Sequence, residues 1–218
     1  SAGPALPTAK QKHGWADSPN VIVNEEWWIT GGLQTGDNSC SGSSSTSEVY
    51  TGSNWKPGPA LPGDEYPVYS CVVNLNTTHT FQIGGGNSGR RDVWLYDWSS
   101  QAWTRTGSLI QGRWVHGCVN LDGERILVAG GIDENDSKDY SVEIYDFTQG
   151  TWSSQPDLPA GINPMYPLLQ NWDGQVLALF RGENQIYQRS EENGEWSVLQ
   201  GVQLPSSFGD YRYDKAIL

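Results

Sequence analysis

Residues 122–152 read DGERILVAGGIDENDSKDYSVEIYDFTQGTW. An apolar run, Ile126-Leu127-Val128, leads into the glycine pair Gly130-Gly131, and Tyr145 and Trp152 follow. Short apolar runs broken by Gly, Asn, Asp and Ser are typical of strands joined by tight turns. The sequence shows no sustained 3.6-residue periodicity, so we expect an all-β fold.

The same order of features occurs four times along the chain. The tryptophans that end each copy are 48, 49 and 44 residues apart. A fixed period of this length indicates copies of one supersecondary unit that bury their faces against one another. The repeat positions are Gly31, Gly32, Tyr50 and Trp55, then Gly84, Gly85, Tyr96 and Trp103, then Gly130, Gly131, Tyr145 and Trp152, and finally Gly182, Tyr187 and Trp196, where Arg181 replaces the first glycine.

Short proline phrases separate the copies, as in Pro59-Ala60-Leu61-Pro62 and Asp157-Leu158-Pro159. A double glycine, then a tyrosine, then a tryptophan, at a period near 50 residues, resembles the kelch repeat family. The resemblance implies a kelch-type β-propeller whose blades are four-stranded antiparallel sheets. The tyrosine would lie on the third strand and the tryptophan on the fourth, and both rings would pack between neighbouring blades.

We place the blades at about 8–56, 57–104, 105–153 and 154–200, with 201–218 as the start of the next blade, so that 1–218 is one partial propeller. At this period six blades need roughly 294 residues and seven roughly 343. We therefore expect a part of a six- or seven-bladed ring. Two alternatives are that another chain completes the ring and that four blades close alone.

Two hairpin turns and three cysteines give more local expectations. Asp122-Gly123 and Asp173-Gly174 are pairs that favour type I′ turns. Cys71 and Cys118 occupy similar places in adjacent repeats, where equivalent atoms are usually too far apart to bond, so we expect two buried thiols. Cys40 lies in a Ser/Gly-rich loop and is a disulfide candidate whose partner is unknown.

The formal net charge of −12 argues against nucleic acid or an anionic membrane surface as the main partner. No apolar stretch reaches the roughly 20 residues that span a bilayer, so we expect no membrane insertion. Asn76-Thr77-Thr78 and Asn135-Asp136-Ser137 are N-glycosylation sequons, and they favour a secreted, extracellular protein.

Strand alternation places the longest connections on one face of the propeller. These join the second strand of a repeat to the third, as at 33–47, 87–92 and 132–139, or join one repeat to the next. Binding residues favour loops on rigid scaffolds, so we expect this face to bind a protein or a glycan. The candidate anchors are Tyr66, Tyr69, Arg90, Arg91, Arg113, Trp114, Tyr166 and Tyr211.

The sequence favours a non-enzymatic scaffold with no cofactor and no metal, since His13, His79 and His116 have no metal-ligand spacing. The alternatives are an intracellular kelch substrate adaptor and a propeller enzyme. Copper-radical oxidases would need more ligands than His116, Cys118 and Tyr140, and residues 146–152 only resemble the Asp-box turn of sialidases. The acidic loop 133–139 fits a solvated surface better than a Ca²⁺ site.

Overall fold

The computed structural model describes residues 47–62, 68–86, 89–202 and 204 in full, together with the backbone of four strands before residue 47. Those four are β1 (Lys10–Gln11), β2 (Asn20–Val23), β3 (Glu26–Thr30) and β4 (Leu33–Gln34). Strands and turns account for the regular structure of these residues, and no helix that is long and apolar enough to cross a membrane occurs in them.

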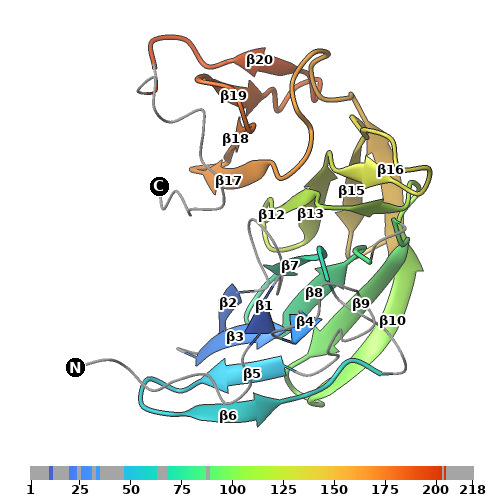
Figure 1. Ribbon diagram of the computed structural model, residues 1–218, viewed down its shortest axis with the longest axis vertical. Coiled ribbons are helices and arrows are strands. Elements are labelled where there is room, and N and C mark those ends of the chain that lie inside the picture. Colours follow the sequence, from blue (N-terminus) through green and yellow to red (C-terminus); the bar gives the residue numbers. More distant parts are fainter. Residues whose placement is uncertain are drawn as a thin grey trace.

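Four antiparallel sheets of four strands each, which we call blades 1 to 4, follow one another along the chain. They fan around a common centre (Figure 1), with the first strands of successive blades side by side at the centre. The all-β prediction of four-stranded antiparallel sheets is confirmed. Blade 1 contains β2, β3, β5 (Ser47–Tyr50) and β6 (Trp55–Gly58); blade 2 contains β7 (Cys71–Asn74), β8 (His79–Ile83), β9 (Asp92–Asp97) and β10 (Ala102–Ser108); blade 3 contains β12 (Gly117–Asn120), β13 (Arg125–Ala129), β15 (Val142–Asp146) and β16 (Thr151–Gln155); blade 4 contains β17 (Leu168–Trp172), β18 (Gln175–Leu179), β19 (Ile186–Arg189) and β20 (Trp196–Val198).

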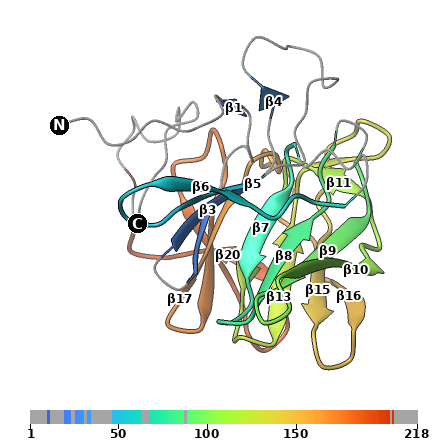
Figure 2. The same cartoon turned by 90° about the horizontal axis from the view of Figure 1, so that it is seen from below.

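Two short ribbons lie outside the blades. β1 pairs with β4, and β11 (Arg113–Trp114) pairs with β14 (Ile132–Asp133). Each ribbon joins the segment that enters a blade to the connection between that blade's second and third strands. Figure 2 shows β4 and β11 at one end of the molecule and the β15–β16 turn at the other. We call the end with the ribbons the long-loop face.

The paired tyrosines and tryptophans lie between blades. The rings of Tyr96 and Trp103 are 5.1 Å apart and pack with Val49 of blade 1. The rings of Tyr145 and Trp152 are also 5.1 Å apart, and they belong to the core between blades 2 and 3. Each pair therefore faces the blade before its own, and burial of these rings is a main source of the contact energy between blades.

The double glycines end the second strand of a blade and also contact the next blade. The Gly85 N–H donates to the carbonyl oxygen of Arg113 at 2.9 Å, and the Gly131 N–H donates to that of Pro164 at 2.7 Å. Both glycines have positive φ, and a Cβ on Gly131 would lie 2.5 Å from the carbonyl oxygen of Trp114, in the segment that enters the same blade. Only glycine fits this close approach of two backbones.

Blade 4 departs from this pattern by one residue. Leu168 pairs with Leu179 just as Gly117 pairs with Ala129, so Phe180 and Arg181 occupy the places of Gly130 and Gly131. Gly182, assigned from the sequence to the glycine pair, lies one residue further on. A Cβ on Gly182 would meet no atom of the described residues within 4 Å, so among these residues Gly182 makes no close contact of the kind that Gly131 makes.

The two turns expected to be type I′ differ. Asp173 and Gly174 both have positive φ, as a type I′ turn requires. At Asp122-Gly123 the prediction is wrong, because only the glycine has positive φ and β12 and β13 are separated by four residues. The side chain of Asn120 accepts the N–H groups of both turn residues at 3.1 and 2.8 Å, and it holds this wider loop.

A ladder of asparagines, which the sequence did not reveal, links the ends of the innermost strands. The Asn120 side-chain amide of blade 3 donates to the carbonyl oxygens of Asn74 and Leu75 in blade 2, at 2.9 and 2.6 Å. Asn171 of blade 4 donates to those of Asn120 and Leu121 at 3.1 and 2.5 Å. Because each amide satisfies two carbonyl groups of the preceding blade, the ladder fixes the register between adjacent blades.

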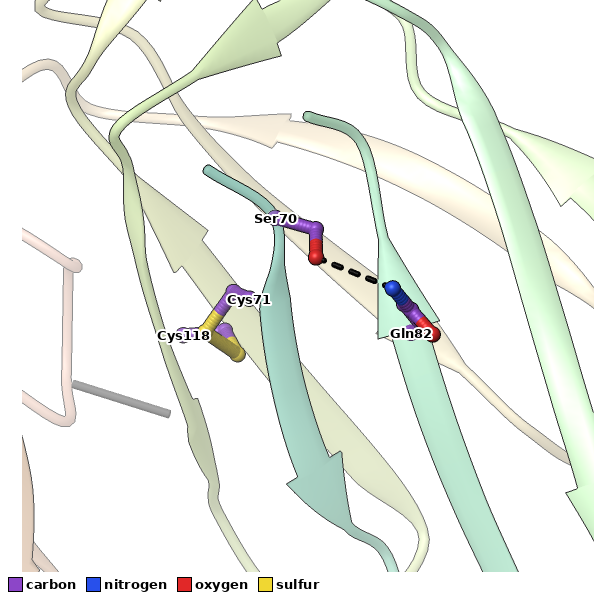
Figure 3. Close-up of a disulfide and its surroundings, with 4 residues drawn as sticks. All are labelled: Ser70, Cys71, Gln82 and Cys118. Carbon is purple, nitrogen blue, oxygen red and sulfur yellow. Dashed lines mark hydrogen bonds between the residues drawn. A yellow bond between two sulfur atoms is a disulfide. The ribbon is translucent and has the colours of Figure 1, made fainter. Parts of the chain in front are cut away.

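A disulfide joins Cys71 of blade 2 to Cys118 of blade 3 across the innermost strands, with their Cα atoms 6.0 Å apart (Figure 3). The prediction of two thiols is therefore wrong. The prediction assumed that Cys71 and Cys118 occupy equivalent positions in their blades. In the structure Cys71 pairs with Ile83, and the residue that makes the equivalent pair, with Ala129, is Gly117 and not Cys118. The offset of one residue reverses the side-chain direction on a strand, so each cysteine faces the other's blade.

Candidate binding face

The structure distributes the predicted anchors unevenly over the long-loop face. Arg91 is exposed, and the side chains of Tyr69, Arg90, Trp114 and Tyr166 are half-buried. Arg113 is fully buried, and Tyr66 and Tyr211 lie outside the described residues, as do Cys40, Gly31 and Gly32.

Three residues with positive φ mark the start of the innermost strands. Tyr69, Val115 and Tyr166 each stand two residues before the first paired residue of blades 2, 3 and 4, and their φ angles are 58°, 51° and 55°. The Val115 N–H donates to the Tyr69 carbonyl at 3.0 Å, and the Tyr166 N–H donates to the Val115 carbonyl at 2.8 Å. A strained backbone that is held by bonds between blades keeps its side chains in fixed positions.

Aromatic and charged groups surround these strand starts. The rings of Tyr69 and Trp114 meet edge to face at 5.3 Å, one from each of two adjacent blades. Arg91 of blade 2 donates two hydrogen bonds to Glu134 of blade 3, at 3.2 and 2.9 Å. This hydrogen bonding to Glu134 raises the pKa of Arg91. We call Tyr69, Arg91, Trp114 and Tyr166 the binding rim; a planar arginine fork and half-exposed aromatic rings are typical of residues that anchor protein interfaces.

Arg113 does not belong to this rim, and its assignment as an exposed anchor is wrong. Its guanidinium lies 2.7 Å from Glu143 Oε1 and 3.1 Å from Asp139 Oδ2, and it donates to the Ser141 carbonyl at 2.9 Å. Glu143 in turn accepts the N–H groups of Ile110 and Gln111 at 2.7 and 3.0 Å. The ion pairs and these hydrogen bonds therefore hold residues 110–113, in the connection that enters blade 3, against Asp139 and Glu143.

In the acidic loop 133–139, the carboxylate of Asp133 is bonded within the loop itself. Asp133 accepts the N–H groups of Asn135 and Ser137, each at 2.9 Å, and the bond from Ser137 is the main cause that lowers the pKa of Asp133. Within the part of the chain that the structure describes, no group of three or more His, Cys, Asp and Glu side chains is placed to hold a metal ion.

The sequon asparagines lie on opposite faces. Asn135 is exposed beside the rim. Asn76 is half-buried in the β7–β8 turn at the other end, where its side-chain oxygen accepts the Thr78 N–H at 2.9 Å.

The residues considered for oxidase chemistry have other roles. Cys118 is bonded to Cys71, and the Tyr140 hydroxyl donates to the Ile162 carbonyl at 3.1 Å. Burial lowers the pKa of His116 to about 3, with a further contribution from the charge of Arg113. His116 is therefore a buried, neutral residue at ordinary pH.

Comparison with known proteins agrees with this geometry. The family model described as Kelch motif matches residues 113–159, which run through blade 3. The chain is a kelch-repeat β-propeller. A solved structure titled "Structure of YjhT" superimposes with a TM-score of 0.68 at 14% identity, covering 94% of this chain and 69% of that one, and it supports the fold alone.

Curated relatives of this kelch-repeat chain are longer proteins. The F-box/kelch-repeat protein SKIP30 of Arabidopsis thaliana is 33% identical over 171 residues, which are 72% of this chain and 45% of the relative. Kelch-like protein 35 of Mus musculus is 31% identical over 109 residues, which are 50% of this chain and 18% of the relative. The chain thus spans less than half the length of these two relatives.

Proposed function

We propose that this kelch propeller is a non-enzymatic binding module of a secreted protein, and that it holds a protein partner on the binding rim. The observation that carries the proposal is the rim itself, where side chains of adjacent blades are fixed against one another by backbone bonds, ring contacts and the Arg91–Glu134 pair. A preformed rim loses little conformational entropy on binding, which favours affinity.

Secretion is supported by two further features. The Cys71–Cys118 disulfide joins two blades, and disulfides of this structural kind persist mainly in oxidising compartments. The Asn135 sequon lies on an exposed turn, where a glycan would have room. A glycan there would stand beside Glu134, so we expect the partner to approach from the side of Tyr69 and Tyr166.

We also propose that further blades complete the ring, from this chain or from another. On the side of blade 4 that faces away from blade 3, Trp172 is 64% exposed, and Leu168 and Leu177 are half-buried. The matching residues of blade 3, among them Leu121 and Leu127, pack against blade 4. The contrast supports a further blade over this side of blade 4, because large apolar side chains favour such burial.

Site-specific photocrosslinking tests the function. A crosslinking amino acid placed at Trp114 should capture one defined extracellular protein, and the same amino acid at Gln149, on the opposite face, should not. Purified wild-type protein should then bind that partner, and Arg91→Ala and Tyr69→Ala should weaken the affinity at least tenfold. The proposal fails if crosslinks form equally at both positions or if the rim variants bind like the wild type.

The second candidate is an intracellular adaptor that presents a protein through the same rim. The curated relatives favour it, since several are named F-box/kelch-repeat or Kelch-like proteins. The two candidates differ in covalent chemistry. Intact mass of the protein from its native source should include glycans and the disulfide if it is secreted, and neither if it is an adaptor.

A further inference from the structure

A polar pocket of about 420 Å³ lies between the outer strands of blades 3 and 4. Its walls come from the start of β13, from the β15–β16 turn and from the β19–β20 turn. The β15–β16 turn is at the end of the molecule opposite β11 (Figure 2), so this pocket is separate from the binding rim. Arg125 and Arg189 both line it, together with the hydroxyls of Thr151 and Ser153.

Arg189 is a half-buried cation without a carboxylate partner among the described residues. Its Nη2 donates to the amide oxygen of Gln155 at 2.9 Å, and its Nε is buried without a hydrogen-bond partner. Its guanidinium lies against Gly194, where a Cβ would be 2.8 Å from Nη2.

The positive charge of Arg125 makes the protonated, charged form of Arg189 less favourable. Burial lowers the pKa of Arg189, and the positive charge of Arg125 lowers it further. Arg125 has a partner of its own, since it donates to Asp122 at 2.6 Å. Two guanidinium groups therefore line one pocket, and that of Arg189 forms no ion pair among the described residues. A partly buried charge in this state is costly, and a bound anion would remove much of the cost.

The remaining walls limit what the anion can be. Asp146, Glu191 and Glu192 also line the pocket, so a ligand with several negative charges would be repelled. The other lining groups are mainly hydroxyls and amides, which suit a polyhydroxy compound better than an apolar one. A carboxylate matches the fork of an arginine with two parallel hydrogen bonds.

We propose that this pocket binds a small polyhydroxy molecule with a single carboxylate, such as a uronic acid, through Arg189 with support from Arg125. The acid group pairs with the guanidinium of Arg189, and the hydroxyls of Thr151 and Ser153 bind the ring hydroxyls. The site does not depend on the binding rim, because it lies on the opposite face and uses none of the rim's residues.

Calorimetric titration with glucuronate tests the proposal, with glucose as the uncharged probe. Glucuronate should bind saturably and more weakly as salt increases, and glucose should bind at least tenfold more weakly. Arg189→Gln should lower the glucuronate affinity at least tenfold, and Arg125→Gln several-fold. Arg105→Gln is the matched control, because Arg105 is an exposed arginine of blade 2 paired with Asp92, and it should leave binding unchanged.

Several results would overturn the assignment. They are equal binding of glucose and glucuronate, unchanged binding by Arg189→Gln, or no binding at concentrations that reveal a Kd of about 1 mM. Arg189→Lys guards against a folding artefact, since it keeps the charge but not the fork. If the lysine variant melts like the wild type and still binds glucuronate fully, the fork of Arg189 does not recognise the ligand.

Discussion

Removing the Cys71–Cys118 disulfide should destabilise the propeller by an amount set by the loop it closes. The two cysteines are 47 residues apart and join the innermost strands of blades 2 and 3. Closing a loop of this length lowers the entropy of the unfolded chain enough to stabilise the folded state by about 4 kcal/mol at 25 °C. The double variant Cys71→Ala/Cys118→Ala should lose roughly this amount of unfolding free energy. Cys71 is buried, but removal of its small sulfur atom leaves only a small cavity and adds little to the loss.

The assay is guanidinium unfolding followed by tryptophan fluorescence, for which the chain supplies 11 tryptophans. The wild type should shift to lower denaturant when a reductant is added, and the double variant should not shift. Thiol titration of the denatured, unreduced wild type should find at most one thiol of the three cysteines, because Cys71 and Cys118 are bonded to each other. Three thiols, or a reductant effect as large in the double variant as in the wild type, would refute the reasoning.

Three further predictions concern the contacts between blades. Asn120→Ala should cost about 2–6 kcal/mol of unfolding free energy, because the side chain loses two interblade bonds and two turn bonds worth about 0.5–1.5 kcal/mol each. The control Asn54→Ala, at an exposed position, should change stability little, and thermal or denaturant melts measure both. Gly131→Ala should destabilise more than Gly161→Ala in the same melts, since both have positive φ but only a Cβ on Gly131 meets the neighbouring backbone. His116 is neutral when folded, with a pKa lowered from 6.5 to about 3, so the unfolded chain binds the extra proton and stability should fall as pH drops from about 6.5 toward 3. His116→Leu should flatten that part of the stability curve, and an identical slope in the variant would contradict the burial argument.

The repeat was readable from the sequence because it depends on local chemistry. Glycines, a tyrosine and a tryptophan recur at one spacing since every blade meets its neighbour in the same way. The disulfide could also have been predicted from the sequence, by counting the residues between each cysteine and the first glycine of its repeat. Cys71 stands 13 residues before Gly84, whereas Cys118 stands 12 residues before Gly130, and this odd difference reverses the direction of one side chain.

Other features depend on contacts that the sequence does not reveal. Arg113 reads as a loop arginine, and only the fold brings Asp139 and Glu143 against it and buries all three. The pocket around Arg189 forms where the turns of two blades meet, so no single motif marks it. Asn74, Asn120 and Asn171 stand at matching places in the sequence, but the ladder of hydrogen bonds that links them depends on how closely the adjacent strands approach.

A double-mutant cycle across two blades tests most directly whether aromatic side chains join neighbouring sheets. Phe81 of blade 2 and Tyr145 of blade 3 are buried with ring centroids 5.4 Å apart. The Phe81→Leu and Tyr145→Leu cycle should give a coupling of about 0.5–1.5 kcal/mol. The Phe81→Leu and Tyr187→Leu cycle, which spans blades 2 and 4, should give none within error. Equal couplings in the two cycles, or no coupling in the first, would contradict the account.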